Sequence, residues 1–411
     1  MAFDVAQIRA QFPILSRPVH GRALHYLDNS ATSQMPEAVL AALAEHETGH
    51  RANVLRGVHF LAEAATEAYE QARIRAARYV NAAEAAEIVF TSGTTMAINL
   101  VAHSLGQMLE PGDEVVITRL EHHSNIVPWQ LLRDRAGIKL KVLPVSREGR
   151  LDLDAIDELL TPRCKLLAVS HVSNVTGAVS DLGRLVAAAR AVGAMVLVDG
   201  AQRAPHGAFD VQALGVDFYA FSGHKMFGPN AIGVLWGRRG LLEEMPPFLG
   251  GGEMIRSVSI AESTWARVPH KFEAGTPPIA QAVGLAAAMD WVESLPGAAV
   301  EEHLNDLAAA VLDGLTLLDG GRGRLRLIGP ASLQNRAPVI SFHVEGAHPH
   351  DICQILDGHG VALRGGHHCA QPLMEAFDLT GTTRASLAVY NDRSDVDALL
   401  SGLEDAIGKL T

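Results

Sequence analysis

Cysteine is scarce in this chain of 411 residues, which contains only three: Cys164, Cys353 and Cys369. An odd, sparse and widely spaced set of thiols does not fit a disulfide framework, and it indicates a reducing, cytoplasmic compartment. Long apolar runs are also missing, since stretches such as 194–198 and 231–236 fall far short of the about 20 residues that a membrane span requires. Charged side chains appear early at the N-terminus without an apolar segment, so we expect no signal peptide.

Positive charge is in deficit as well. The chain has 34 Lys and Arg residues against 46 Asp and Glu residues, which gives a net charge of −12, and no basic run stands out. This balance argues against binding to nucleic acid or to an anionic membrane surface. Hydrophobic residues make up 48% of the chain and charged residues 19%, which is enough apolar material for a large buried core. From the length we expect roughly two or three domains.

Short apolar runs alternate with helix-like segments between about residues 85 and 240. The runs are rich in Val, Ile and Leu and do not alternate with polar residues, which is typical of strands buried on both faces of a mostly parallel sheet. They lie at 87–91, 113–118, 139–145, 165–172, 194–199, 217–222 and 231–236. Helical segments such as 94–109 and 182–192 separate them. We therefore predict a large α/β domain.

The pattern changes after the Gly- and Pro-containing bend EAGTPP at 273–278. Helical spacing covers 278–319, and the strands and helices expected after it are 324–329, 338–344, 349–358 and a last helix from about 394. This order indicates a second, smaller α+β domain. We predict a large domain at 26–277 and a small domain formed by 1–25 and 278–411.

Polar residues follow several of the predicted strands, where ligands gather in open α/β sheets. Thr94 and Thr95 belong to a Gly-containing turn that opens a helix, Asp199 ends an apolar strand, and Lys225 follows another. Each has an ordinary explanation by itself: a helix cap, a structural ion pair or a solvated lysine. Together they match pyridoxal phosphate (PLP), with a lysine for the Schiff base, a carboxylate for the pyridine nitrogen and a helix N-terminus for the phosphate. Neither a G-x-G-x-x-G motif after an early strand nor a P-loop is present to suggest a nucleotide.

Longer motifs point to a family. They are EHHSNIVPW (121–129), SHVSNVTG (170–177), VDGAQ (198–202), FSGHKMFGP (221–229), FEAGTP (272–277), RGGHHCAQPLM (364–374) and TRASLAVYN (383–391). In this order they resemble the class V aminotransferase-fold cysteine desulfurases, and most closely their SufS-like branch (type II cysteine desulfurase/selenocysteine lyase). The resemblance runs from about residue 8 to residue 405. It implies a fold-type I PLP-dependent transferase with a large, mostly parallel domain and a smaller α+β domain.

The resemblance implies a role for each matching side chain around the cofactor. Lys225 matches the Schiff-base lysine and Asp199 the partner of the pyridine nitrogen. Gln202 matches the group beside the phenolate oxygen, and His122 the residue that stacks on the ring and serves in catalysis. The implied phosphate contacts are Thr94, Thr95, Ser222, His224 and Thr276, the last reaching the phosphate of the partner subunit, which implies a homodimer. The family usually shows R-G-T-T-E in the phosphate loop, whereas this chain has Ser92 and Met96 there, which leaves open the contact made by that Arg or Glu.

The segment RGGHHCAQPLM could by itself be a metal site or a reactive thiol. Two adjacent histidines point in different directions and rarely reach one ion, so we expect no metal there. The resemblance implies that a Cys369 thiolate takes the sulfur of L-cysteine as a persulfide and leaves alanine. The nearby histidine and a mobile Gly-Gly hinge favour a thiolate that can swing in and out. It also implies that Asn174, Arg384 and Arg364 bind the substrate, with Arg384 on the carboxylate.

The implied function is a cytoplasmic cysteine desulfurase that supplies sulfur for iron–sulfur cluster assembly, through an acceptor of the SufE or SufU type. A selenocysteine lyase, and an aminotransferase or kynureninase-like hydrolase without need of Cys369, remain open. A protein that only binds a ligand, without catalysis, is a further alternative, and it would require that Lys225 carries no covalently bound cofactor. His350 resembles a histidine that serves a zinc-containing SufU-like acceptor, although its segment could equally only cap a helix. Cys164 and Cys353 adjoin apolar patterns, and we expect them to be buried and inert.

Overall fold

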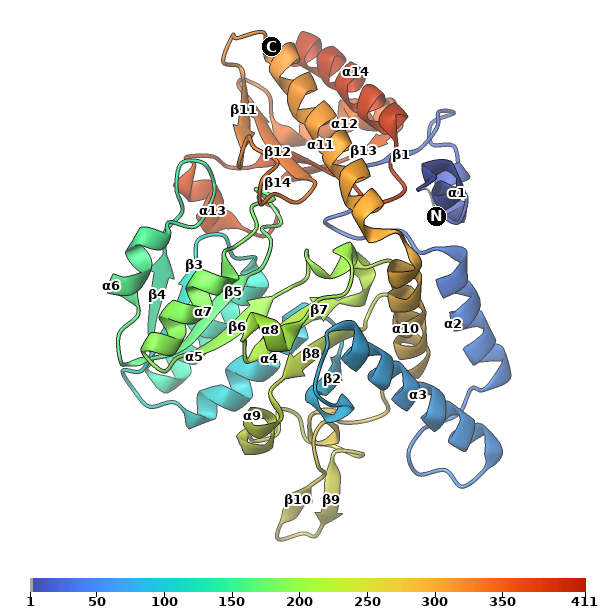
Figure 1. Cartoon of the computed structure of the whole chain (residues 1–411), viewed down its shortest axis with the longest axis vertical. Coiled ribbons are helices and arrows are strands. Elements are labelled where there is room, and N and C mark those ends of the chain that lie inside the picture. Colours follow the sequence, from blue (N-terminus) through green and yellow to red (C-terminus); the bar gives the residue numbers. More distant parts are fainter. Residues whose placement is uncertain (1–2) are drawn as a thin grey trace.

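The computed structural model describes residues 3–411, so residues 1 and 2 of the predicted small domain lie outside the described part. A seven-stranded sheet forms the lower half of the molecule in Figure 1, with the strand order β2-β8-β7-β6-β5-β3-β4. Its strands are β2 (Ile88–Thr91), β3 (Glu114–Thr118), β4 (Lys139–Leu143), β5 (Cys164–Ser170), β6 (Met195–Asp199), β7 (Phe218–Ser222) and β8 (Gly233–Gly237). Each apolar run of the sequence has become one of these strands. Only β8 runs in the opposite direction to the other six strands, so the predicted mostly parallel sheet is confirmed.

Both faces of this sheet are buried, which explains the continuous apolar runs. Val115 and Ile117 of β3 belong to one apolar core, whereas Val116 belongs to the core on the opposite face. Helices α4 (Thr94–Ser104), α5 (Val127–Ala136) and α9 (Arg239–Glu244) cover the first face. The second is covered by α3 (Phe60–Tyr79), α6 (Ile156–Leu159), α7 (Leu182–Ala191), α8 (Val211–Leu214) and α10 (Ile279–Ser294). The α/β class is therefore confirmed.

A smaller antiparallel sheet lies above the first one in Figure 1, with the order β11-β12-β15-β14. It consists of β11 (Leu325–Ile328), β12 (Val339–Val344), β14 (Arg364–Gly366) and β15 (Thr382–Ser386), and α11 (Gly297–Asp319), α12 (Pro349–Gly358) and α14 (Arg393–Leu410) enclose its core. The predicted helical stretch 278–319 is broken at Pro296, which precedes α11. Proline ends such a run because it has no N–H for the helix ladder.

The N-terminal segment joins the two parts. Strand β1 (His25–Tyr26) pairs in parallel with β13 (Val361–Ala362), and Asp28 then bridges to Ser386 of the small sheet. Helix α10 packs against α2 (Glu37–Gly49) and α3, beside the large sheet. The remaining elements are α1 (Val5–Arg9), α13 (Gln371–Ala376) and the hairpin β9 (Ile255–Val258) with β10 (Ser263–Trp265), which projects from the bottom of the molecule in Figure 1. The division at 26–277 stays a prediction.

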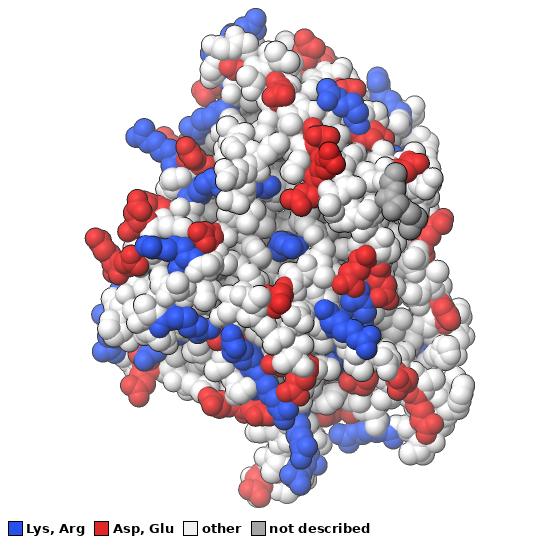
Figure 2. Space-filling model, viewed as in Figure 1, with Lys and Arg blue, Asp and Glu red and all other residues white. Residues whose placement is uncertain are grey.

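Basic and acidic side chains are interspersed over the face of the molecule shown in Figure 2. Within residues 3–411, none of the helices combines the length and the apolar character needed to cross a membrane.

Candidate active site

A cavity of about 320 Å³ opens where the strands of the large sheet end. Asp199 and Ser222 are the last residues of β6 and β7, and Lys225 follows in a short 3₁₀ turn. The cavity also receives side chains from the small sheet. It therefore brings together most of the side chains that the sequence predicted: Thr94, Thr95, His122, Asn174, Asp199, Gln202, Ser222, His224, Lys225, Arg364, Cys369 and Arg384.

Burial shifts the pKa values of Lys225 and Asp199, which both line this cavity, in opposite directions. Burial lowers the pKa of the Lys225 amine, Asp199 opposes that shift, and Arg384 adds to it. Burial raises the pKa of the Asp199 carboxyl, against the influence of Lys225. The Asp199 side chain accepts a hydrogen bond from the Ala201 N–H at 3.0 Å, and none of the described residues forms an ion pair with it. The site thus holds a buried carboxylate in need of a cation and an amine biased toward its neutral, nucleophilic form.

The start of α4 forms an anion cradle next to this pair. Gly93 has a φ of 142°, a conformation that favours glycine, and a Cβ there would lie 3.2 Å from Ser222 Oγ. The Thr94 N–H donates to Ser222 Oγ at 2.8 Å, and the two hydroxyl oxygens are also 2.8 Å apart. A helix N-terminus flanked by hydroxyl groups suits a phosphate. Met96, which stands where the resembling family has an acid, is exposed.

His122 and Gln202 are held by their neighbours. His122 Nδ1 accepts a hydrogen bond from the Ser124 N–H at 3.1 Å, which fixes the ring. Burial, together with the charge of Lys225, lowers the pKa of His122 to about 3, so the imidazole is neutral at physiological pH. Gln202 Nε2 donates to the Ser30 carbonyl at 2.8 Å. A neutral, oriented ring is suited to stacking on a flat cofactor.

Two arginines from the small sheet face the same cavity, and Asp28 binds both. Arg364 donates to both carboxylate oxygens of Asp28, at distances of 3.0–3.2 Å, and Arg384 Nη2 donates to Asp28 Oδ1 at 3.2 Å. Arg384 Nη1 donates to the Asn174 carbonyl at 2.9 Å, while its buried Nε has no hydrogen-bond partner. Two cations and one anion leave one net positive charge, which matches one substrate carboxylate.

Asp28 was not among the site residues predicted from the sequence, although a local pattern could have indicated it. It follows β1 in the stretch HYLDNS, which is the same strand-then-aspartate pattern that singled out Asp199. His123 was also not predicted, because only the first histidine of EHH matched the resembling family.

Asp28→Asn is expected to raise the KM for the amino acid by about tenfold and to leave kcat within about threefold, since one charge-assisted anchor of two arginines is lost. Steady-state kinetics check this. Asp157→Asn is the matched control, because it removes one carboxylate of an ion pair with Arg184 on the surface and should change neither constant. A lower KM in Asp28→Asn would show that Asp28 competes with the substrate for the arginines.

Cys369 lies in a short turn between β14 and α13, and its side chain is exposed to the cavity. His368 and Cys369 both have positive φ values, of 51° and 55°. The turn is fixed from several sides: the His123 N–H donates to the Cys369 carbonyl at 2.7 Å, and Asn174 Nδ2 donates to the His368 carbonyl at 2.8 Å. The structure therefore presents the thiol on a firmly positioned turn.

The expected Gly-Gly hinge is part of a strand in this structure. Gly365 and Gly366 belong to β14 and pair with Thr383 and Thr382 of β15. A Cβ at position 365 would lie 2.8 Å from the Pro349 carbonyl oxygen. Glycine is needed here for close approach to the start of α12, which is a different reason from flexibility.

The other two cysteines differ from Cys369. Cys164 is 1% exposed, and burial raises its pKa to about 11. Cys353 lies half-buried in α12, where burial raises its pKa to about 12. Neither one lines the cavity, so Cys369 is the thiol placed for chemistry.

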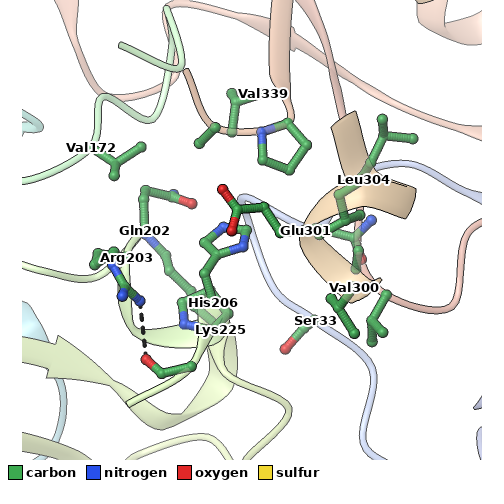
Figure 3. Close-up of a pocket in the computed structure, with 18 of the residues that line it drawn as sticks. Ser33, Val172, Gln202, Arg203, His206, Lys225, Val300, Glu301, Leu304 and Val339 are labelled. Atoms are coloured by element: carbon green, nitrogen blue, oxygen red, sulfur yellow. Dashed lines mark hydrogen bonds between the residues drawn. The ribbon is translucent and has the colours of Figure 1, made fainter. Parts of the chain in front are cut away.

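A second cavity of about 360 Å³ adjoins the first one. Gln202 and Lys225 line both of them, and Val172, Leu304 and Val339 give the second cavity an aliphatic wall (Figure 3). The anion cradle, Asp199 and Cys369 belong only to the smaller cavity. The smaller cavity is therefore the candidate site for a cofactor and for chemistry at the thiol.

Thr276 and His350 are the predicted site residues that do not line the cavity. Thr276 is exposed, just after Glu273, whose carboxylate is anchored by Arg73 at 2.7 Å and by the Phe90 N–H at 2.7 Å. His350 is exposed at the start of α12, with Nε2 3.2 Å from the Gly365 carbonyl oxygen.

Comparison with known proteins bears on this site. The model of the class V aminotransferases matches residues 25–399. The chain belongs to the class V aminotransferase family. A probable cysteine desulfurase of Streptomyces coelicolor is 49% identical, with 98% of this chain and 96% of that protein covered. The crystal structure of the cysteine desulfurase CsdA (S-sulfonic acid) from Escherichia coli is 41% identical, covers 100% of both chains and has a TM-score of 0.91. The structure of a lysine-to-alanine mutant of C-DES, with glycine covalently linked to its PLP cofactor, is 25% identical. The match covers 97% of this chain and 99% of that chain, with a TM-score of 0.82.

The class V aminotransferase site described above fits PLP, the cofactor of this family. The cradle at Thr94, Ser222 and the N-terminus of α4 would hold the phosphate. A protonated pyridine nitrogen would supply the cation that the buried Asp199 carboxylate lacks. Lys225 lies in the same cavity as the amine for the covalent link. Among the class V aminotransferases, the relatives named above group this chain with the cysteine desulfurases.

Proposed function

We propose that this protein is a PLP-dependent cysteine desulfurase of the SufS-like type, which converts L-cysteine to L-alanine and leaves the sulfur as a persulfide on Cys369. The observation that carries the proposal is the exposed Cys369 thiol in the same cavity as Lys225 and Asp199. A transaminase or a hydrolase has no use for a thiol in that position. The names of the relatives support the same activity.

The chain supplies four functions to this reaction. PLP, when bound, supplies an electron sink for the carbon skeleton of the substrate. Asp199 holds the charge on the pyridine nitrogen, and Lys225 offers an amine and a proton carrier beside it. Arg384 and Arg364 bind and orient the carboxylate of the amino acid. His122, neutral through its lowered pKa, packs in the cavity without adding a charge.

The sulfur step belongs to Cys369. Its thiolate attacks the sulfur of the substrate, and an S–S bond forms as the substrate C–S bond breaks. The electron pair of the broken bond stays with the carbon skeleton, which takes up a proton and leaves as alanine. One thiol and one cysteine thus become one persulfide and one alanine, so no external oxidant or reductant is needed.

The test is product analysis of the purified holoenzyme with L-cysteine. We expect one alanine per persulfide in a single turnover, and mass spectrometry should place the added sulfur on Cys369. Pyruvate and ammonia in place of alanine, or a persulfide on Cys164 or Cys353, would contradict the proposal. A parallel assay with L-selenocysteine measures the preference between the two substrates.

We also propose that the enzyme works as a homodimer, with Thr276 of the partner subunit completing the phosphate site. Thr276 is exposed and outside the cavity of its own chain, which is the position expected of a residue that serves a second copy. Exposed apolar side chains support a covered surface in the assembly; they include Val58, Phe60, Leu249, Ile260 and Trp265. Light scattering measures the mass directly, and a monomeric holoenzyme would contradict this proposal.

The sulfur is proposed to pass to an acceptor of the SufE or SufU type and to serve iron–sulfur cluster assembly. His350→Ala is expected to spare single-turnover alanine formation and to slow turnover with a zinc-containing acceptor, because neutral imidazole is a good zinc ligand and His350 lies exposed beside β14. His348→Asn is the matched control, since it removes the neighbouring exposed imidazole but keeps a capping side chain. Equal loss of activity with dithiothreitol as the only acceptor would show that His350 supports the fold.

A further inference from the structure

Three soft donor groups converge at the mouth of the active-site cavity. His123 comes from the 3₁₀ turn after β3, and His367 and Cys369 come from the turn between β14 and α13. One potential ligand atom of each residue lies within 4.8 Å of the other two. Across residues 3–411, no other set of His, Cys, Asp and Glu side chains converges in this way. We refer to these three residues as the His-His-Cys cluster.

The cluster does not depend on the two adjacent histidines of the HHC motif. His368 is buried and faces away, with Nε2 3.0 Å from the carbonyl oxygen and from the hydroxyl of Thr382. The second imidazole is supplied instead by His123, whose ring centroid is 5.5 Å from that of His367. His367 and His368 therefore do point in different directions, as expected for adjacent histidines. The cluster uses only one of these two histidines, so their divergence does not exclude a metal site.

Backbone hydrogen bonds hold the cluster in place. The Gln371 N–H donates to His123 Nε2 at 3.1 Å, and the Cys369 N–H donates to His367 Nδ1 at 3.0 Å. The ring nitrogen that accepts each of these bonds carries no proton, and its lone pair points at the backbone N–H. A cation can take that lone pair, or bind the other ring nitrogen after the ring changes tautomer, and in either case the backbone hydrogen bond is given up.

We propose that the His-His-Cys cluster is a reversible binding site for a borderline-soft divalent cation such as Zn²⁺. Zinc binds thiolate and imidazole at about 2.0–2.3 Å, and sites with three protein ligands keep a fourth position for water or substrate. At the upper limit of 4.8 Å between ligand atoms, their midpoint lies about 2.8 Å from each of them. Side-chain rotations that release the backbone hydrogen bonds to the two rings bring the three ligand atoms to that distance.

Binding of the cation takes the Cys369 thiol out of the sulfur chemistry. The thiol loses its proton to solvent, and the sulfur lone pair that would attack the substrate forms the bond to the metal. The metal is a regulator in this proposal and has no part in the catalytic cycle, because it occupies the thiolate that the sulfur step needs. The inhibitory consequence rests on the proposed function, whereas the site itself rests on geometry alone.

The experiment is a titration of the reduced, metal-free holoenzyme with Zn²⁺ against a chromophoric chelator. We expect one Zn²⁺ per chain, and a loss of affinity of about tenfold or more in Cys369→Ser, His367→Asn and His123→Asn. Cys353→Ser and His348→Asn remove the same residue types outside the cluster and should keep the affinity of the wild type. Cofactor absorbance and thermal melting verify that each variant is folded.

Two further readouts make the result specific. Co²⁺ should give thiolate-to-metal absorption in the wild type and none in Cys369→Ser, and Zn²⁺ should slow alkylation of Cys369 only when both histidines are present. No stoichiometric binding by the wild type, or equal affinity in the cluster variants, would overturn the proposal. Because binding is measured without cysteine, zinc binding in a protein that forms no persulfide would refute the proposed function and leave the site standing.

Discussion

Cys369→Ser is expected to keep the cofactor and to bind L-cysteine, yet to form alanine about 10³-fold more slowly or worse, the scale of removing a nucleophile. The reason is that the mutated atom acts only on the sulfur of the substrate. Lys225, Asp199 and the arginines, which line the same cavity from other elements, are left intact. Absorption spectra with L-cysteine report on the ring chemistry, and chromatography of alanine reports on the sulfur step.

The controls for this variant are the two remaining thiols. Cys164→Ser and Cys353→Ser should keep most of the activity, since the first thiol is buried and the second half-buried, both have raised pKa values, and both lie outside the cavity. A Cys369→Ser enzyme that turns over at a rate close to the wild type would remove the central element of the proposed mechanism and favour an aminotransferase-like or hydrolase-like reaction.

Lys225→Ala is expected to reduce turnover by about 10³-fold or more. The visible absorption of the covalently bound cofactor should also be absent from this variant. The lysine is the amine at the floor of the cavity, and burial biases it toward the neutral form needed for covalent bonding. Borohydride reduction of the wild type followed by peptide mapping should place the cofactor on Lys225.

Lys141→Ala serves as the comparison for this variant, because Lys141 pairs with Glu114 at 2.8 Å, away from the cavity, and should affect neither the spectrum nor the rate. A reduced cofactor found on another lysine, or an unchanged spectrum in Lys225→Ala, would contradict the assignment.

The parts of the fold that sequence could predict are those with strong local signals. The strands β2 to β8 follow the apolar runs, all of them buried except the edge strand β4, and the helices between them follow the usual spacing. β1, β13 and β14 have two or three residues each, and their pairing is set by tertiary contacts that no local pattern records. The same limit explains Gly365 and Gly366, which resemble a hinge in sequence but form a strand against β15.

The candidate site shows a similar division. Lys225, Asp199 and the helix start at Thr94 could be predicted because polar residues at strand ends meet at one edge of a parallel sheet. The ion pairs of Asp28 with Arg364 and Arg384 join parts of the chain that are 336 and 356 residues apart, and sequence distance gives no measure of such proximity. The convergence of His123 with Cys369 depends on the docking of one turn on another.

The substrate contacts are divided between the two sheets: the proposed carboxylate ligands Arg364 and Arg384 belong to β14 and β15, whereas Asp199 ends β6 and Lys225 follows β7. An amino acid whose carboxylate is held by the small sheet and whose amino group is held beside the large sheet therefore links the two halves of the molecule. Thermodynamic linkage then requires that whatever holds the halves together also tightens substrate binding, and that substrate in turn stabilises their association. Under the proposed function, a ligand with an amine but no carboxylate would contact only the half that holds Lys225 and Asp199 and would lose this mutual stabilisation, so the way the two sheets meet would favour α-amino acids.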